Sequence, residues 1–239
     1  MTSPPADPTA DPTADHGRRT QAERRAESER RLLLASAELI VERGLENTSL
    51  ADIGRRAGAS HAAVNHRFGS KDELVDRLIE AAGAYYIDEA SARLVDRTGI
   101  DALLTVCALY LELVGSDHPY GRVHIVLWSE AIAHAAERRA AHLDWDHQFR
   151  RAVRAWLRDG IAAGSVDPAI PVAEVAISVV ATLRGLAMQL LLDPDGTDLV
   201  LAQATVETVV RDALRPGASG SGGPGRQSGS PVSPSPAPA

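Results

Sequence analysis

Apolar residues recur every three to four positions through most of this 239-residue chain, which is the spacing of one face of an α-helix. No run alternates Val, Ile, Thr or Tyr with polar residues convincingly enough to predict a β-strand. The pattern therefore predicts an all-α fold of about nine helices. Their expected ranges are 20–43, 50–57, 61–67, 71–96, 100–115, 119–135, 137–163, 171–192 and 198–214.

Capping residues and helix-breaking residues set the expected ends of these helices. Thr20 with Glu23 three residues later has the form of a capping box, and Gly44 is a natural helix end. Ser60 is expected to cap the third helix and Ser70 the fourth, while either Thr48 or Ser49 caps the second. The later helices are separated by breaks at Gly99, 115–119, 164–171 and 193–196.

Proline, glycine and serine are concentrated at the two ends of the chain. Four of the 14 prolines lie in residues 1–17 and six in residues 216–239, and large apolar side chains are nearly absent from both segments. Such segments do not bury enough apolar surface to fold, so both are expected to be disordered tails. The rest divides into a segment of residues 18–75 and a longer helical body of residues 76–215.

Composition excludes several classes of protein. The single cysteine, Cys107, rules out an intrachain disulfide framework and a cysteine-rich zinc site. No apolar run approaches the ~18–20 residues that cross a bilayer, and the start of the chain lacks the basic and apolar segments of a secretory signal. We therefore expect a cytoplasmic protein that does not enter a membrane.

Positive charge is gathered near the start of the folded part. Residues 17–71 hold eleven Arg and Lys against seven Asp and Glu, a net charge of +4, whereas all other residues together carry −11. A basic segment joined to an acidic body indicates a domain that binds a polyanion. The alternative is an Arg-rich, solvated helix face, and charge alone does not decide between the two.

Two short helices in this basic segment, 50–57 and 61–67, have the lengths and the connecting turn of a helix-turn-helix. Gly58 supplies the backbone freedom that the tight turn needs, and Gly54 is small where the two helices cross. The apolar core between the helices is expected to consist of Ile53, Ala57 and Val64.

The second short helix would leave a polar face of a size suited to the major groove of DNA. That face consists of His61, Ala62, Asn65 and His66. Ser60 and Lys71 lie at helix N termini, where backbone N–H groups favour phosphate. A helix-turn-helix that serves only for packing is the alternative, but the helix caps, the basic segment and Lys71 all argue for DNA.

Several runs follow one another in fixed order between roughly residues 25 and 78. They are Thr48-Ser49-Leu50, Asp52-Ile53, Ala57-Gly58-Ala59-Ser60, Val64, Phe68 and Ser70-Lys71-Asp72-Glu73-Leu74. In this register they resemble the DNA-binding domain of the TetR family of bacterial transcription regulators. The resemblance implies phosphate contacts for Thr48, Ser49, Ser60 and Lys71, and base or backbone contacts for His61, Ala62, Asn65 and His66.

Asn65 departs from the pattern of many family members, which carry a Tyr at this position that usually touches phosphate. An Asn leaves the role of this residue open between a phosphate contact and recognition of adenine.

The resemblance also implies a homodimer formed by the helices near 171–192 and 198–214, and a cavity for a small-molecule effector among the middle helices. Aromatic residues with a few polar groups suit such a cavity. The candidates to line it are Tyr110, His124, Trp128, His134, Trp145 and Arg184. The alternative is that these are ordinary core aromatics whose polar tips are hydrogen-bonded.

A metal site is not expected, because the five histidines of the body do not show the four-residue spacing of ligands on one helix face. His142 and Asp146 have that spacing, but with Arg150 beyond them they are interpreted as a surface charge cluster. No cofactor is expected either.

These patterns predict a ligand-responsive, homodimeric transcriptional repressor that binds a palindromic operator and is released when a small molecule binds the body. An activator without an effector is the first alternative. An enzyme in the helical body is the second, although neither a nucleophile elbow nor a phosphate-binding glycine loop is found. A drug-sized cavity closed around Trp128 would favour a sensor, and a filled core would favour an activator without an effector.

Overall fold

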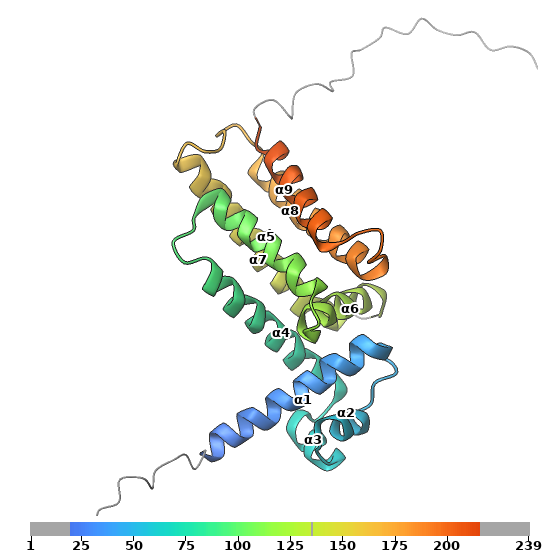
Figure 1. The fold of residues 1–239 in the computed structure, drawn as a ribbon. Coiled ribbons are helices and arrows are strands. Elements are labelled where there is room, and N and C mark those ends of the chain that lie inside the picture. The colour runs from blue at the N-terminus through green and yellow to red at the C-terminus, as the bar shows by residue number, and fades with distance from the viewer. Residues whose placement is uncertain (1–19, 135, 216–239) are drawn as a thin grey trace, which may run out of the picture.

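The computed structural model describes residues 20–134 and 136–215, and every regular element in this part of the chain is an α-helix (Figure 1). The helices are α1 (Gln21–Arg43), α2 (Leu50–Ala57), α3 (His61–Phe68), α4 (Lys71–Arg93), α5 (Gly99–Gly115), α6 (Pro119–His134), α7 (Ala136–Ala162), α8 (Val172–Leu192) and α9 (Leu199–Ala213). The all-α prediction is confirmed. The two predicted tails, 1–17 and 216–239, lie outside the described residues.

The helix ends agree closely with the sequence signals. Thr20 and Glu23 form the expected capping box, with the Thr20 backbone N–H donating to Glu23 at 2.7 Å. Ser49, not Thr48, caps α2. The fourth helix ends at Arg93, three residues earlier than the pattern predicts, and the next loop holds a residue with positive φ.

The small N-terminal unit, α1 to α3 and the start of α4, shares its core with the body. Side chains from α1, α2 and α3, including Ile40, Ile53 and Val64, pack in the same apolar cluster as Tyr120 and Leu127 of α6. Helix α1 lies directly on α6 and also contacts α2, so it connects the body to the short helices.

The body is a helical bundle in which α5 and α7 lie between α4 on one side and α8 and α9 on the other (Figure 1). Its core is made by the apolar faces of α5, α7, α8 and α9. The long helix α4 leads from the N-terminal unit into this bundle, so it belongs to both parts (Figure 1).

Helix α8 is long and apolar enough to cross a membrane, with a mean hydropathy of 1.9 over its most apolar window. The prediction that no apolar segment approaches this length is therefore wrong for Val172–Leu192. In the structure 44% of that window is buried, and the helix packs against α5, α7 and α9. Arg184, in the middle of the helix, forms an ion pair with Asp146 of α7. Helix α8 is thus part of the bundle core.

Candidate functional site

The turn between α2 and α3 depends on two glycines. Gly58 adopts a left-handed conformation with φ 68°, which favours glycine strongly. The backbone then folds back, so that Ala59 N–H donates to the Gly54 carbonyl at 2.8 Å. A Cβ atom on Gly54 would lie only 2.9 Å from the Ala59 carbonyl oxygen. The close crossing of the two helices therefore requires glycine at position 54.

Helix α3 buries one face and exposes the other. Val64 and Phe68 are buried in the apolar core of the N-terminal unit. The four residues predicted to face DNA are all exposed, namely His61, Ala62, Asn65 and His66. A short, exposed, polar helix held by its apolar side has the form of a recognition helix that enters the major groove.

Three helix N termini lie close in sequence around this helix, and each is capped by a serine. Ser49 accepts from the Asp52 N–H at 3.2 Å, and Ser60 accepts from the Ala63 N–H at 3.1 Å. Ser70 caps α4, whose first residue is the half-buried Lys71. These N termini carry the partial positive charge that attracts phosphate groups.

Thr48, which was also predicted to contact phosphate, is buried, unlike Ser49 and Ser60. Its side chain is 2% exposed, and its hydroxyl donates to the Gly44 carbonyl at 2.9 Å. The structure thus uses Thr48 to close the loop between α1 and α2. The buried position of Thr48 argues against the predicted phosphate contact through its side chain. Ser49 beside it is exposed and is better placed for that contact.

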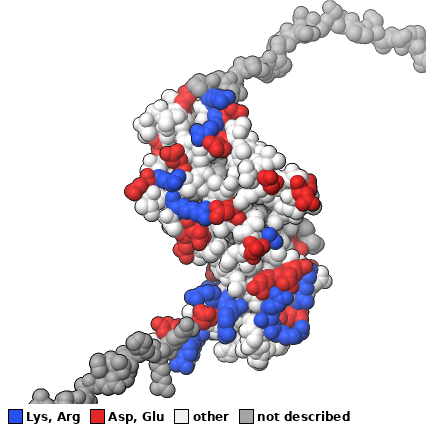
Figure 2. All heavy atoms as spheres, viewed as in Figure 1, with Lys and Arg blue, Asp and Glu red and all other residues white. Residues whose placement is uncertain are grey.

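Ion pairs hold the recognition helix against its neighbours. Glu29 of α1 accepts from Arg67 of α3 at 3.3 Å and from Arg77 of α4 at 2.6 Å. Arg56 of α2 pairs with Glu42 of α1 at 2.7 Å. Figure 2 shows Lys and Arg gathered with acidic residues at the α1–α4 end of the molecule. Part of the basic excess therefore fixes the geometry of the short helices and is not free for DNA.

The Asp52 carboxylate, which completes the capping box of α2 with Ser49, stays ionised over the whole physiological pH range. The Ser49 hydroxyl donates to it at 2.6 Å and, together with Arg43, lowers the pKa of Asp52 to about 2. Asp52 also accepts from Arg43 at 2.9 Å, which ties the start of α2 to the end of α1.

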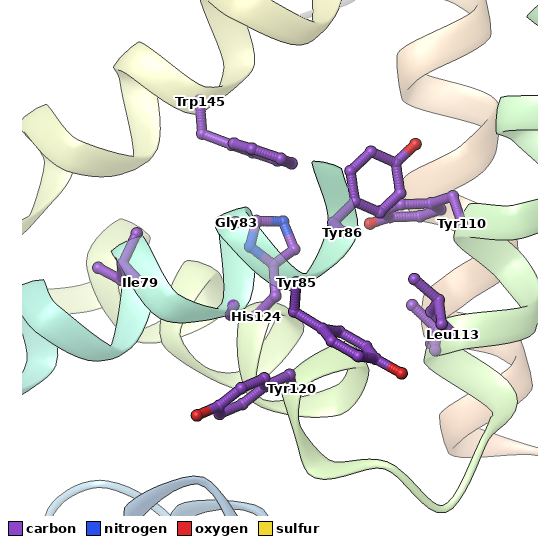
Figure 3. A pocket seen from close by; sticks show the side chains of 12 residues that line it. Ile79, Gly83, Tyr85, Tyr86, Tyr110, Leu113, Tyr120, His124 and Trp145 are labelled. Atoms are coloured by element: carbon purple, nitrogen blue, oxygen red, sulfur yellow. The ribbon is translucent and has the colours of Figure 1, made fainter. Parts of the chain in front are cut away.

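A second candidate site is a cavity of about 30 Å³ among α4, α5, α6 and α7, which has room for one water molecule. Figure 3 shows its aromatic walls. The ring centroids of Tyr86 and Trp145 lie 5.5 Å apart, and those of Tyr86 and Tyr110 lie 6.2 Å apart. His124 contributes the polar part of the wall, with its ring centroid 6.1 Å from that of Trp145.

Several polar atoms in this region are buried without a hydrogen-bond partner in the described part of the chain. They are Oη of Tyr110, Nε2 of His124, Nδ1 of His142 and Nη1 of Arg184. The other terminal nitrogen of Arg184 donates to Asp146, and the guanidinium lies 4.8 Å from the ring centroid of Trp128. Unpartnered buried polar atoms are rare and costly, so a cluster of them indicates a site that a ligand or water completes.

Trp145 separates this cavity from two hollows at the surface. One hollow, of about 590 Å³, lies between α4 and α7, and the other, of about 240 Å³, extends along Tyr86 and Phe149. All three spaces include Trp145 in their walls. The ring of Trp145 lies so close to Gly83 that a Cβ atom there would be 3.2 Å from it.

Three of the six predicted lining residues, Tyr110, His124 and Trp145, lie around this cavity. Trp128 and Arg184 are not part of its wall. They form a cation–π pair with each other, and Arg184 acts on the pKa of both Tyr110 and His124, so it lies beside them. The His134 side chain lies outside the described part. The alternative of satisfied core aromatics does not hold for Tyr110 and His124, because their polar tips have no partner among the described residues.

Sequence reasoning missed the contribution of α4, whose Gly83, Tyr85 and Tyr86 line the cavity. The adjacent tyrosines at positions 85 and 86 are the sequence signal for this contribution. The interpretation of His142 and Asp146 as a surface charge cluster is wrong, since His142 is 4% exposed and Asp146 pairs with the buried Arg184. In the described residues no group of three or more His, Cys, Asp and Glu is placed to hold a metal ion.

An exposed recognition helix joined to a helical body that contains a cavity defines a DNA-binding transcription regulator. The model of bacterial regulatory proteins of the TetR family matches residues 32–78, and the model of the C-terminal part of BetI-type transcriptional repressors matches residues 99–215. This chain belongs to the TetR family.

Known proteins agree with this assignment. The HTH-type transcriptional repressor KstR2 of Rhodococcus jostii is 28% identical over 172 residues, which is 69% of this chain and 74% of that protein. The FadR regulator of Bacillus subtilis, solved with stearoyl-CoA, superposes with a TM-score of 0.67 at 17% identity, covering 77% of this chain and 97% of FadR. The TetR family regulator PfmR of Thermus thermophilus superposes at 0.61 with 23% identity, covering 76% and 97%. At these identities the two structures establish the fold alone.

Proposed function

We propose that this protein is a homodimeric transcriptional repressor that binds a palindromic operator through α3 and leaves it when a small molecule binds the body. The observation that carries the proposal is the pairing of an exposed recognition helix with a cavity of unpartnered polar groups in one rigidly packed chain. The structure of FadR with stearoyl-CoA supports the effector part, because that relative in fold binds a small molecule. We expect the protein to act in the cytoplasm, where its DNA lies.

The dimer is proposed to form through the outer face of α8 and α9. Large apolar side chains on this face are unusually exposed for a folded domain, which indicates an interaction surface. They are Ile177 at 50%, Met188 at 48%, Leu192 at 81%, Val200 at 74% and Leu201 at 53%. Pairing with a second copy would form a four-helix interface and place two recognition helices on one DNA duplex.

Helix α4 provides the link between the two sites. Its first residue, Lys71, lies next to the recognition helix, and Gly83 and Tyr86, more than three turns further along the helix, line the cavity. A molecule that enters the cavity presses on α4 and, through α6, on α1. It would thereby favour a spacing of the two recognition helices that does not match the operator.

Replacing Lys71 with Ala is expected to weaken binding to all DNA sequences alike. Because a cation beside phosphate releases a counterion on binding, the slope of log affinity against log salt should fall by about one. Affinity measured by fluorescence anisotropy at several salt concentrations checks this. Lys71→Arg, which keeps the charge, should retain the wild-type slope, and an unchanged slope for Lys71→Ala would refute the phosphate contact.

Release by an effector distinguishes the sensor from an activator without one. A compound that raises the melting temperature of the protein by binding the body should lower its affinity for operator DNA by about 5–150-fold. The reciprocal measurement should agree, since operator DNA must weaken binding of that compound by the same factor. Compounds that stabilise the protein but leave operator affinity unchanged would favour the activator.

A further inference from the structure

The unpartnered atoms beside the cavity share one chemical character. Tyr110 Oη and Arg184 Nη1 both carry protons that they are free to donate, and the ring nitrogen of His124 either donates or accepts. Tyr110 is 5% exposed and Arg184 is 8% exposed, so water reaches neither side chain freely. A group that accepts hydrogen bonds is what these atoms lack.

The charges around these atoms are already balanced. Arg184 donates to Asp146, so the buried cation and the buried anion neutralise each other. Burial lowers the pKa of His124 to about 3, with Arg184 and His142 adding to the effect, and burial likewise lowers the pKa of His142. Both rings are therefore neutral at pH 7. A further charge brought into this region would leave one charged group unpaired where little water reaches it, which opposes binding.

The walls of the cavity define the rest of the ligand. Tyr86, Tyr110 and Trp145 present aromatic rings, and Ile79 of α4 and Leu113 of α5 add apolar side chains to the wall (Figure 3). Such walls suit a flat apolar or aromatic body, which gains from burial and from ring contacts.

We propose that the effector is an uncharged, largely apolar molecule with one hydrogen-bond acceptor such as a carbonyl oxygen. The acceptor receives a hydrogen bond from Tyr110 in the cavity wall and lies beside His124, and Arg184 behind the wall is the second donor. This ligand class rests on the proposed function, since it describes the molecule that the regulatory cavity binds. The cavity is closed to about 30 Å³, so the ligand enters by displacing Trp145 toward the hollow between α4 and α7.

Four naphthalenes that differ in a single substituent at the β position test this proposal on the full-length protein. Acetylnaphthalene carries a neutral acceptor, ethylnaphthalene carries none, naphthoate is an anion and naphthylmethylammonium is a cation. Calorimetric titration should show the ketone binding about tenfold more tightly than the hydrocarbon, as expected for one or two added hydrogen bonds. Both charged compounds should bind at least about tenfold more weakly than the ketone.

Two Tyr→Phe variants test whether Tyr110 is the residue that donates a hydrogen bond to the acceptor of the ligand. Tyr110→Phe removes the buried hydroxyl and should reduce the preference for the ketone over the hydrocarbon by about three- to tenfold. Tyr120→Phe is the matched control, because Arg30 of α1 acts on the pKa of Tyr120 and its hydroxyl points away from the cavity (Figure 3). That variant should keep the wild-type preference. The melting temperature of each variant reports its folding, and the wild-type series tests the ligand class without either variant.

The outcomes separate the ligand class from the proposed function. If naphthoate or naphthylmethylammonium binds more tightly than the ketone, the ligand class is overturned and an effector site remains. Equal affinity for the ketone and the hydrocarbon would show that the site does not recognise a hydrogen-bond acceptor. An equal loss of the preference for the ketone in Tyr110→Phe and Tyr120→Phe would overturn the proposed hydrogen bond from Tyr110. If none of the four binds, the ligand class is overturned, whereas the effector part of the proposed function is judged separately, by whether any compound that stabilises the protein lowers its operator affinity.

Discussion

Replacing Arg184 with Ala is expected to lower the free energy of unfolding by about 3–5 kcal/mol. The Arg184 side chain is 9% exposed and that of its partner Asp146 is 19% exposed, so truncation leaves a carboxylate with little water and no cation. The same change removes the cation–π contact with Trp128. Thermal unfolding at a fixed protein concentration should show a melting temperature roughly 6–20 °C lower than wild type.

A double variant distinguishes loss of the pair from loss of packing. Arg184→Met combined with Asp146→Leu removes both charges and keeps most of the volume, so it should be close to wild type in stability. If Arg184→Ala costs less than about 1 kcal/mol, the carboxylate is well solvated and the pair is an ordinary surface ion pair. That result would also remove the charge balance on which the ligand class depends.

Replacing Ile177 with Glu is expected to convert the dimer to a monomer and to weaken operator binding by about 10²–10⁴-fold. Ile177 is 50% exposed in the single chain and lies on the proposed interface of α8 and α9. A carboxylate there would be buried opposite apolar side chains of the partner, which opposes association. Sedimentation velocity reports the oligomeric state, and anisotropy titration reports the operator affinity.

Val95→Glu is the matched control for this experiment. Val95 is also apolar and 67% exposed, but it lies in the loop between α4 and α5, away from the α8–α9 face. It should leave both the dimer and operator binding unchanged. A dimer that survives Ile177→Glu would show that the chain associates through another surface, and the spacing of the recognition helices would have to be derived from that surface.

The N-terminal unit was predictable from sequence because its signals are local. Serine caps, Gly54 and Gly58 act within a few residues, and they mark α2 and α3 with little dependence on the rest of the chain. Even there, the choice between Thr48 and Ser49 as the cap could not be made, because both side chains have the right chemistry. Only the packing of the loop buries Thr48 and leaves Ser49 exposed.

The cavity was less predictable because its wall comes from four helices. Tyr110, His124 and Arg184 were picked for their chemistry, but nothing local in the sequence places Tyr86 of α4 against Trp145 of α7. The pairing of Arg184 with Asp146 spans 38 positions of sequence, and the four-residue spacing of His142 and Asp146 suggested a solvated cluster instead. Helical spacing identifies which face is apolar, but it does not tell which other helix covers that face.

Selection of binding sites from random DNA by the full-length protein shows directly whether α3 reads a palindromic operator. We expect enrichment of a twofold-symmetric site whose half-sites are one helical turn apart, about 34–36 Å, or a multiple of it. Asn65→Ala should then change the preferred base at one or two positions in each half-site. Retention of DNA without any preferred sequence, weakening steeply with salt, would refute operator recognition, because α3 would then hold phosphate without reading bases.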